Sequence, residues 1–576
     1  MAYSLASSGT LLAGLWLLPL AVGDFWIFQF GLYFLYAIAA LGIGICWGQA
    51  GFLPLGQAMF VGLGAYLGGF SLIHFGDSLL LYPLLLLSAI VPGLLAYLIG
   101  QAVFRGRTES GPYFALITLA LSLLTFQIAT NWKDLTGGFN GLMGIPSLPG
   151  FDDFGDIYYV IALALALAIA ATRWLLRAPI GVLWRAVAQN ERRLSFFGYD
   201  TAMLKALAFG ASGVLAGIGG VLYAPQQGLV TPQLSGFLLS AELVIWTAVG
   251  GRSRLFGPVI GVVLVGTLTA ELRDTVMVWE LLVAVLFLAV VLFLPNGVAG
   301  LAAPLTRLLE RRRYGAEVAA PPSGRPDVPI TLEIDNVSAA AGEVKILDDL
   351  SLTFDRPGIH CIIGPNGAGK TSIFNMLTGD LAAQGGQVRV DDQRVEDRSA
   401  ARMALMGVGR KFQIPSVFPD LSISDNLNVA LWGGRASIVD LLRPGRRRWS
   451  SPTLDTLRDR FPFLADGNRP ARVLSHGQRQ ILELVMALIA EPRLLLLDEP
   501  CAGLSAEETR QVMAVVLWAR DNLPVRIVII EHDMTLVREL ADHVFVVHQG
   551  RLLASGSVEE IQADPLVRDV YVGVGA

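Results

Sequence analysis

Charged residues and cysteines are both scarce in this chain of 576 residues. Asp, Glu, Lys and Arg make up only 16% of the chain, whereas hydrophobic residues make up 53%. This balance is too apolar for a soluble protein and favours a membrane protein. No basic stripe is interleaved with aromatic residues, so the sequence lacks the footprint of a nucleic-acid-binding protein. The three isolated cysteines, Cys46, Cys361 and Cys501, exclude a zinc-binding spacing and a disulfide framework.

Long apolar stretches are confined to the first 300 residues or so, where they recur ten times. Most of them approach the ~20 residues that a helix needs to cross ~30 Å of hydrocarbon. We therefore expect an N-terminal α-helical polytopic membrane domain with about ten transmembrane helices. The stretches cover residues 9–22, 26–47, 55–75, 79–103, 112–130, 156–176, 204–224, 235–250, 256–270 and 276–294.

Arginines gather in alternate loops between these stretches, whereas the opposite loops carry aspartates or almost no charge. Loops rich in Lys and Arg face the cytoplasm. The alternation therefore predicts an even number of crossings with both termini inside. The arginines are Arg105 and Arg107, the group from Arg173 to Arg193, Arg252 and Arg254, and the group from Arg307 to Arg313.

Glycines cluster inside two of the apolar stretches, around Gly64 and around Gly217. Small residues let membrane helices approach closely, so the clusters predict tight helix packing. An alternative is a broken or re-entrant helix that lines a transport path near Gly48 to Gly56.

The composition changes after the last apolar stretch. Residues 312–329 form a Pro-rich segment that predicts a flexible linker. From residue 330 onward, strand and helix patterns alternate, which predicts an α/β domain with a largely parallel sheet. The expected division is a transmembrane domain at 1–311, a linker at 312–329 and a cytoplasmic domain at 330–576.

A phosphate-binding loop follows the apolar strand expected at Ile359 to Ile363. The sequence GPNGAGKT matches the G-x-x-x-x-G-K-[ST] pattern, in which backbone N–H groups at a helix start bind phosphate. Lys370 would reach the β- and γ-phosphates, and the Thr371 hydroxyl would bind Mg²⁺. The nucleotide-binding residues expected here are Gly364, Pro365, Asn366, Gly367, Ala368, Gly369, Lys370, Thr371 and Ser372.

Four further motifs point to nucleotide hydrolysis. The apolar strand from Leu494 ends in Asp498, placed to hold Mg²⁺, and Glu499, placed to polarise a water molecule. His532 follows another apolar strand and would contact the γ-phosphate, while Gln413 would sense that phosphate and Mg²⁺. The motif LSHGQ opens a helix, and Ser475, Gly477 and Gln478 there offer groups to a phosphate at the helix N-terminus.

Taken together and in this order, these motifs resemble those of an ABC-transporter ATPase. The resemblance implies an α/β ABC-type P-loop ATPase domain that uses ATP and Mg²⁺, with Glu499, His532 and Gln413 as catalytic residues and Thr371, Gln413 and Asp498 as metal ligands. It also implies a sandwich of two ATPases, in which Ser475, Gly477 and Gln478 cover the ATP of the partner. The polar loop helix from Arg185 to Arg193 is then either a plain basic loop or a coupling helix that docks on an ATPase; its length favours the coupling helix.

The membrane half resembles the M-type permease of branched-chain amino acid importers at residues 131–146 and 189–192. The second half is similar to the G-type ATPase of the same importers in the insert between Gln413 and Leu474 and in the ending Tyr571 to Gly573. A fused permease and ATPase for ATP-driven uptake of a small polar solute is implied. The resemblance further implies a bacterial inner-membrane location, a second permease and a second ATPase (or a second copy of this chain), and a periplasmic solute-binding protein.

Two features depart from this family. Residues 410–415 (RKFQIP) and LSHG look closer to ATPases of urea and short-chain amide importers, so the solute is either a branched-chain amino acid or such an amide. In addition, many ABC ATPases stack an aromatic residue on adenine near a position that is occupied here by Ala339 to Ala341.

Two other classes share parts of this pattern. An ABC exporter half-transporter has the same order of permease and ATPase, but it usually has six longer spans with large cytoplasmic extensions, unlike the more numerous, shorter and Gly-rich stretches here. A regulatory protein with an ABC-type ATPase would not need intact Glu499 and His532. We therefore favour the importer.

Overall fold

The chain divides into two compact units. Unit 1 comprises Met1–Ala188, Thr201–Arg313 and Leu442–Gly445, and unit 2 comprises Gln189–Asp200, Tyr314–Leu441 and Arg446–Ala576. The structure, a computed structural model, describes residues 14, 16–105, 111–151, 154–273, 278–301, 317–356, 358–395, 398–443 and 448–572.

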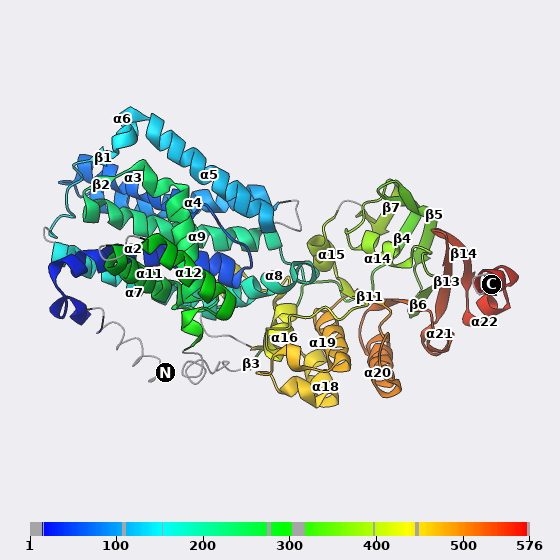
Figure 1. The fold of residues 1–576 in the computed structure, drawn as a ribbon. Coiled ribbons are helices and arrows are strands. Elements are labelled where there is room, and N and C mark those ends of the chain that lie inside the picture. The colour runs from blue at the N-terminus through cyan, green and yellow to red at the C-terminus, as the bar shows by residue number, and fades with distance from the viewer. Residues whose placement is uncertain are drawn as a thin grey trace. The chain divides into compact units, whose positions relative to one another are not determined.

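Unit 1 is built from apolar helices, coloured blue to green in Figure 1. Two short strands, β1 (Leu142–Met143) and β2 (Leu229–Val230), pair antiparallel within it. Its longer helices are α2 (Asp24–Ile43), α3 (Gln57–Phe75), α4 (Leu81–Phe104), α5 (Gly111–Asn131), α7 (Phe154–Arg177), α9 (Thr201–Gln227), α10 (Phe237–Gly250), α11 (Gly257–Arg273) and α12 (Trp279–Phe293), and α6 (Lys133–Thr136) is a single turn.

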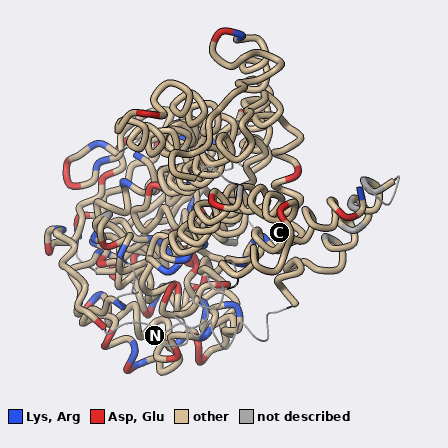
Figure 2. The backbone as a smooth tube through the Cα atoms, turned by 90° about the vertical axis from the view of Figure 1, so that its left-hand side faces the viewer, with Lys and Arg blue, Asp and Glu red and all other residues tan. Residues whose placement is uncertain are grey.

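Each expected apolar stretch from 26–47 onward coincides with one of these helices, while the first, 9–22, lies partly outside the described residues. Within the described residues, six helices are long and apolar enough to cross a membrane, and α10 is a shorter apolar helix. No Asp, Glu, Lys or Arg occurs between Asp24 and Asp77, and long stretches of the tube in Figure 2 are accordingly free of charge. The prediction of a polytopic helical domain is confirmed.

Glycines in unit 1 permit close helix contacts, as the sequence predicts. A Cβ on Gly64 of α3 would lie 2.6 Å from the Gly217 carbonyl oxygen of α9, and a Cβ on Gly220 would collide with the Val61 carbonyl. Helical structure is also interrupted before α3. After α2 the chain forms a π-helix at Gly44–Gln49 and is then non-helical until α3 begins. Tight packing and a helix break therefore both occur.

Unit 2 contains a six-stranded sheet in the order β14-β13-β6-β12-β11-β9. Its strands are parallel except that β14 runs antiparallel to β13. All five residues of β6, β11 and β12 are buried, as expected for central strands of a parallel sheet. The bounds are β6 (Ile359–Ile363), β9 (Val408–Lys411), β11 (Leu494–Asp498), β12 (Arg526–Ile530), β13 (His543–His548) and β14 (Arg551–Gly556).

A second, antiparallel sheet in the order β5-β4-β7-β8 shares a buried apolar core with the first. Its strands are β4 (Leu332–Ala341), β5 (Val344–Phe354), β7 (Gly385–Val390) and β8 (Gln393–Arg394). The helices that accompany the two sheets are α14 (Lys370–Leu377), α15 (Ala400–Met406), α16 (Ile423–Trp432), α17 (Ile438–Leu442), α18 (Pro452–Arg460), α19 (His476–Ile489), α20 (Ala506–Asn522), α21 (Met534–Leu540), α22 (Val558–Ala563) and α23 (Pro565–Val572).

The Pro-rich segment predicted as a flexible linker has specific contacts in its described part. Strand β3 (Glu317–Ala319) pairs parallel with β10 (Arg448–Ser450). The Arg325 guanidinium donates hydrogen bonds to the Ala404 carbonyl at the end of α15 (2.8 Å) and to the Ala490 carbonyl at the end of α19 (2.7 Å). Composition alone could not reveal these contacts, because they join residues that are far apart in sequence. The domain boundaries at 311 and 329 stay predictions, and the first of them lies outside the described residues.

Candidate active site

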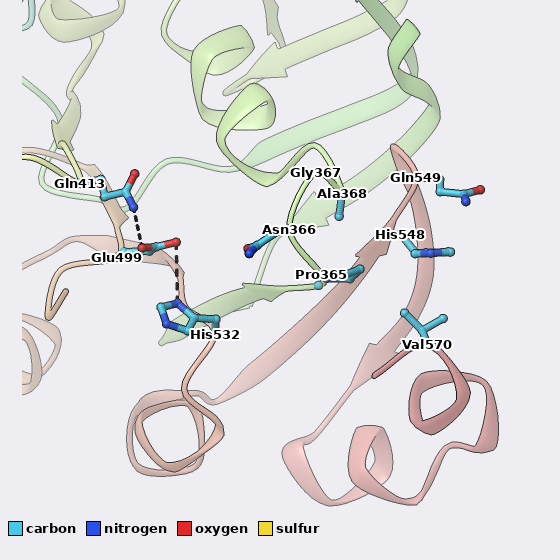
Figure 3. A pocket seen from close by; sticks show the side chains of 11 residues that line it. Pro365, Asn366, Gly367, Ala368, Gln413, Glu499, His532, His548, Gln549 and Val570 are labelled. Carbon is cyan, nitrogen blue, oxygen red and sulfur yellow. Dashed lines mark hydrogen bonds and ion pairs between the residues drawn. The ribbon is translucent and has the colours of Figure 1, made fainter. Parts of the chain in front are cut away.

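A pocket of about 670 Å³ opens in unit 2 along the predicted phosphate-binding loop. Figure 3 places Gln413, Glu499 and His532 on one side of that loop and His548, Gln549 and Val570 on the other. Residues that the sequence separates by more than 180 positions thus surround a single cavity. It is lined by Gly364, Pro365, Asn366, Gly367, Ala368, Gln413, Glu499, His532, His548, Gln549 and Val570.

The loop lies between β6 and α14, as the sequence predicts. Gly364 cannot be replaced by a larger residue, because a Cβ there would collide with the Val547 carbonyl. Gly369 caps α14 with a φ of +98°, a conformation that glycine adopts at little cost. The N-terminus of α14, with Lys370, Thr371 and Ser372 in its first turn, therefore follows directly on the loop, an arrangement that suits a phosphate.

Lys370 is held inside this loop. Its ammonium donates to the carbonyl oxygens of Gly364 (2.7 Å) and Pro365 (3.0 Å), and its side chain is buried. Burial lowers the pKa of Lys370, and the nearby Glu499 and Asp498 carboxylates oppose that shift. The positively charged Lys370 ammonium is thereby held at the N-terminus of α14, close to the backbone of the phosphate loop.

Glu499 is oriented by two polar side chains. Gln413 Nε2 donates to Glu499 Oε2 (2.8 Å), and His532 Nδ1 lies 3.7 Å from Glu499 Oε1 (Figure 3). The Glu499 backbone has a φ of +42°, which is unfavourable for a residue with a side chain, and its N–H donates to the Ile530 carbonyl (3.0 Å). The structure thus brings together all three residues that the sequence predicts as catalytic.

Asp498 precedes Glu499 at the end of β11 and is buried, with 3% of its surface exposed. Arg410 approaches its Oδ2 at 3.6 Å, whereas its buried Oδ1 has no hydrogen-bond partner among the described residues. Burial raises the pKa of Asp498, and Arg410 opposes the shift. Burial in turn lowers the pKa of Arg410 to about 10. A buried carboxylate oxygen without a partner is the kind of group that a hydrated cation would satisfy.

The predicted signature residues lie outside this pocket. Ser475 caps α19: its Oγ accepts from the Gln478 N–H (3.1 Å), and Gln478 Oε1 accepts from the Ser475 N–H (3.2 Å). Gly477 packs so closely on Glu508 that a Cβ would collide with its carboxylate. Ser475, Gly477 and Gln478 are not among the residues that line the pocket. Within one chain, they therefore lie apart from the pocket at the phosphate loop.

Residues Gln189–Asp200 belong to unit 2, although unit 1 precedes and follows them in sequence. Helix α8 (Pro179–Ser195) loses helical geometry at Asn190, whose Oδ1 accepts from the Arg193 N–H (2.8 Å). Asn190 Nδ2 donates to Ser416 Oγ (2.9 Å), and the Tyr199 hydroxyl donates to the Val429 carbonyl (2.9 Å). The predicted loop helix is therefore present and is anchored on the α/β unit.

Arg193 makes buried polar contacts within unit 2. Its guanidinium donates to the Arg410 carbonyl (2.6 Å) and lies 3.4 Å from Glu483 Oε1, and both side chains are completely buried. Burial lowers the pKa of Arg193, and Glu483 opposes the shift. The Phe412 N–H donates to the same Glu483 oxygen (3.2 Å), and Phe412 immediately precedes Gln413. A short chain of contacts thus leads from Arg193 to the Gln413–Glu499 pair.

Sequence reasoning missed His548, Gln549 and Val570. His548 and Gln549 lie at a two-residue turn between β13 and β14, in which Gln549 and Gly550 both have positive φ. The Gln-Gly pair after an apolar strand signals a hairpin turn but gives no hint of a ligand. Val570 lies on the C-terminal helix α23, directly before the ending Tyr571 to Gly573, which resembles the G-type ATPase but gives no hint of a ligand.

The fold and this site define an ABC-type ATPase joined to a polytopic membrane domain, and comparisons with known proteins agree. Residues 27–294 match the family described as "Branched-chain amino acid transport system / permease component", and residues 347–502 match the family described as "ABC transporter".

The relatives are ATP-binding proteins that align with the second half. The High-affinity branched-chain amino acid transport ATP-binding protein LivG of Escherichia coli is 36% identical over 249 residues, which are 42% of this chain and 97% of LivG. BraF of Pseudomonas aeruginosa, which bears the same description, is 33% identical over 248 residues, with 42% and 97% covered. A crystal structure of a nucleotide-free ATP-binding cassette from an ABC transporter has 26% identity and a TM-score of 0.37, and it covers 42% of this chain and 98% of that chain.

The chain therefore belongs to the ABC transporters of the branched-chain amino acid transport type, as a fusion of a permease with an ATP-binding subunit. It is a multi-pass membrane protein whose second half is an ATP hydrolase coupled to transport.

Proposed function

We propose that this chain imports a branched-chain amino acid across the bacterial inner membrane, driven by ATP hydrolysis. The observation that carries the proposal is the pocket that joins the phosphate loop to Gln413, Glu499 and His532, in a chain that also contains a permease of the matching family. The relatives LivG and BraF, which are named for branched-chain amino acid transport, support the solute class.

The phosphate loop from Gly364 to Ser372 binds the phosphates of ATP, with Lys370 on the β- and γ-phosphates. Glu499 polarises the attacking water, because it is the carboxylate that faces the pocket beside His532. His532 contacts the γ-phosphate. Gln413, which already holds Glu499 through its amide, reports the state of that phosphate. Positioning and charge stabilisation then provide most of the rate enhancement.

Mg²⁺ fits beside the phosphates. Asp498 offers a buried oxygen that has no other partner among the described residues, and Thr371 offers a hydroxyl in the first turn of α14. Asp498, Thr371 and Gln413 would hold the ion, which neutralises phosphate charge during transfer to water.

A second ATPase completes each site. Ser475, Gly477 and Gln478 lie outside the pocket of their own chain, and the start of α19 is exposed at Ser475, so this helix end can cover ATP bound by a partner. The partner is a second ATPase or a second copy of this chain. A second permease and a periplasmic solute-binding protein complete the importer, and residues 1–311 and 330–576 act as its permease and cytoplasmic ATPase domains.

Residues 189–200 act as a coupling helix. Their contacts with Ser416, Val429, Arg410 and Glu483 support this role, because the last two adjoin the segment that ends in Gln413. The arginine-rich loops support a topology in which this segment, the ATPase and both termini are cytoplasmic.

Urea and short-chain amides are the competing solutes, so the test is direct uptake. The chain would be reconstituted in liposomes with a candidate second permease, second ATPase and solute-binding protein, and entry of labelled leucine, urea and acetamide would be followed. ATP-dependent entry of leucine alone supports the proposal, and the Glu499→Gln variant should abolish it. Entry of urea or acetamide instead would reassign the solute, and efflux of hydrophobic compounds would reassign the chain to the exporters.

A further inference from the structure

The pocket continues past the phosphate loop to a part of unit 2 to which the function proposed above assigns no role. Gln413, Glu499 and His532 mark the end at which the γ-phosphate is cleaved, and His548, Gln549 and Val570 lie on the opposite side of the loop (Figure 3). A nucleoside triphosphate bound along the loop therefore directs its ribose and base toward this second end.

The strand position that commonly supplies an aromatic residue for the base offers none here. Residues 337–347 contain no Phe, Tyr, Trp or His, and the Ala339 side chain is fully buried in the antiparallel sheet. Any aromatic residue that stacks on the base must consequently come from another segment.

The turn that carries His548 and Gln549 is fixed to the phosphate loop. The Gly550 N–H donates to the Ala368 carbonyl of the loop (3.0 Å), and the Gly550 carbonyl accepts from the Asp348 N–H of β5 (3.0 Å). Arg551 Nε, directly after the turn, donates to Asp348 Oδ2 (2.8 Å). The turn is thus positioned by backbone contacts on both sides, and its distance from the loop is set by the fold.

The side chains at this end suit a purine nucleoside. An imidazole ring stacks on a base as other aromatic rings do, and a glutamine amide both donates and accepts hydrogen bonds. Val570 adds an apolar wall from α23, and His548 and Val570 are each only partly exposed.

We propose that His548, Gln549 and Val570 form the nucleoside subsite of this ATPase, with His548 stacking on the base in place of the missing strand aromatic. The proposal rests on the role proposed above for the phosphate loop.

Binding experiments on the full chain in lipid distinguish contacts with the nucleoside from contacts with the phosphates. With Glu499→Gln in the background to prevent hydrolysis, affinities would be measured for Mg-ATP and for Mg-tripolyphosphate, which has the phosphates but no base. His548→Ala should weaken ATP about 10-fold and leave tripolyphosphate unchanged, whereas His548→Phe should preserve ATP affinity. Lys370→Ala should weaken both ligands. Gln549→Ala should weaken ATP alone, whereas its matched control Gln511→Ala, at an exposed position on α20, should weaken neither ligand.

A second readout needs no variant. Photolabelling with 8-azido-ATP should modify the peptides that contain 548–549 or 565–572. Labelling of strand β4 instead, or equal losses of ATP and tripolyphosphate affinity in His548→Ala, would overturn the subsite. Failure of the role proposed for the phosphate loop would give a different result, namely a Lys370→Ala variant that binds ATP as the parent does.

Discussion

At the scale of single residues, Glu499 has the surroundings that a water-activating carboxylate needs. Gln413 Nε2 donates to one of its oxygens at 2.8 Å, and His532 Nδ1 lies 3.7 Å from the other. Its φ of +42° costs free energy, which the rest of the fold must offset. Strain of this kind, held beside a pocket, is more often a functional constraint than a packing accident.

We expect Glu499→Gln to slow ATP hydrolysis about 10²- to 10⁴-fold, the range for loss of a general base. ATP affinity should change little, because binding rests on the phosphate loop. Phosphate release and ATP binding would be measured on the same preparation. Glu507→Gln is the matched control, since Glu507 is 64% exposed on α20 and its contacts with Arg510 and Gln511 are at the surface. If Glu499→Gln keeps half of the parent rate, another group activates the water.

The sequence predicts the phosphate half of the pocket but not the nucleoside half. Gly364 to Ala368, Gln413, Glu499 and His532 belong to motifs with fixed spacing, and the structure brings them to one cavity. His548 and Val570 belong to a hairpin turn and a terminal helix, whose positions depend on how the strands are ordered in the sheet. No local sequence pattern predicts the order of the strands in the sheet.

At the scale of elements, the segment at 189–200 depends on a buried ion pair. Arg193 and Glu483 are both fully buried, and Glu483 also accepts from the Phe412 N–H. Removing one member of such a pair leaves an uncompensated buried charge, which typically costs about 3–5 kcal/mol. The neighbouring Arg192–Asp380 pair is instead half exposed at Arg192 and is expected to contribute at most about 1 kcal/mol.

Arg193→Ala should therefore release residues 189–200 from the α/β unit and uncouple ATP hydrolysis from transport, while Arg192→Ala should do neither. Hydrogen exchange at 189–200 and the ratio of solute transported to ATP hydrolysed are the measurements. The double variant Arg193→Met with Glu483→Leu, which removes both charges, should regain protection. Equal exchange in Arg193→Ala and Arg192→Ala would show that the buried pair does not hold the segment.

Arg325 fastens the described part of the linker to two helix ends. Its guanidinium donates to carbonyls of Ala404, Leu405, Ala490 and Glu491, where a cation also opposes the negative ends of the helix dipoles.

We expect Arg325→Ala to raise hydrogen exchange at residues 317–329 and to lower the thermal midpoint of the full chain by a few degrees, the change expected for about 1–2 kcal/mol. Arg510→Ala removes an equally large side chain whose pairing with Glu507 is at the surface, and it should leave both quantities as they were. Unchanged exchange in Arg325→Ala would mean that strand β3 alone holds the linker.

The sequence predicts some helices and strands well and misses others, and the difference has a physical cause. Apolar helices such as α4 and α9 and buried strands such as β6 and β11 follow from the length and periodicity of their own residues. Strand β3 and the contacts of Arg325 do not, because a Pro-rich composition predicts mobility and the partners lie more than 75 residues away in sequence.

At the scale of the whole molecule, the signature residues of this chain lie apart from its own pocket, and we propose that they complete the pocket of a partner ATPase. The pocket gathers the phosphate loop, Glu499 and His532, whereas Ser475 and Gly477 lie elsewhere on α19. One chain alone should therefore bind ATP but hydrolyse it slowly, and a partner ATPase should restore the rate.

The most direct test of the importer proposal is ATP hydrolysis by the complete assembly in lipid, measured as a solute-binding protein is added with and without its solute. The proposed function predicts that only the solute-loaded binding protein raises the rate and that Glu499→Gln abolishes the rise. A rate that ignores every binding protein but increases with hydrophobic compounds would contradict import and favour an exporter.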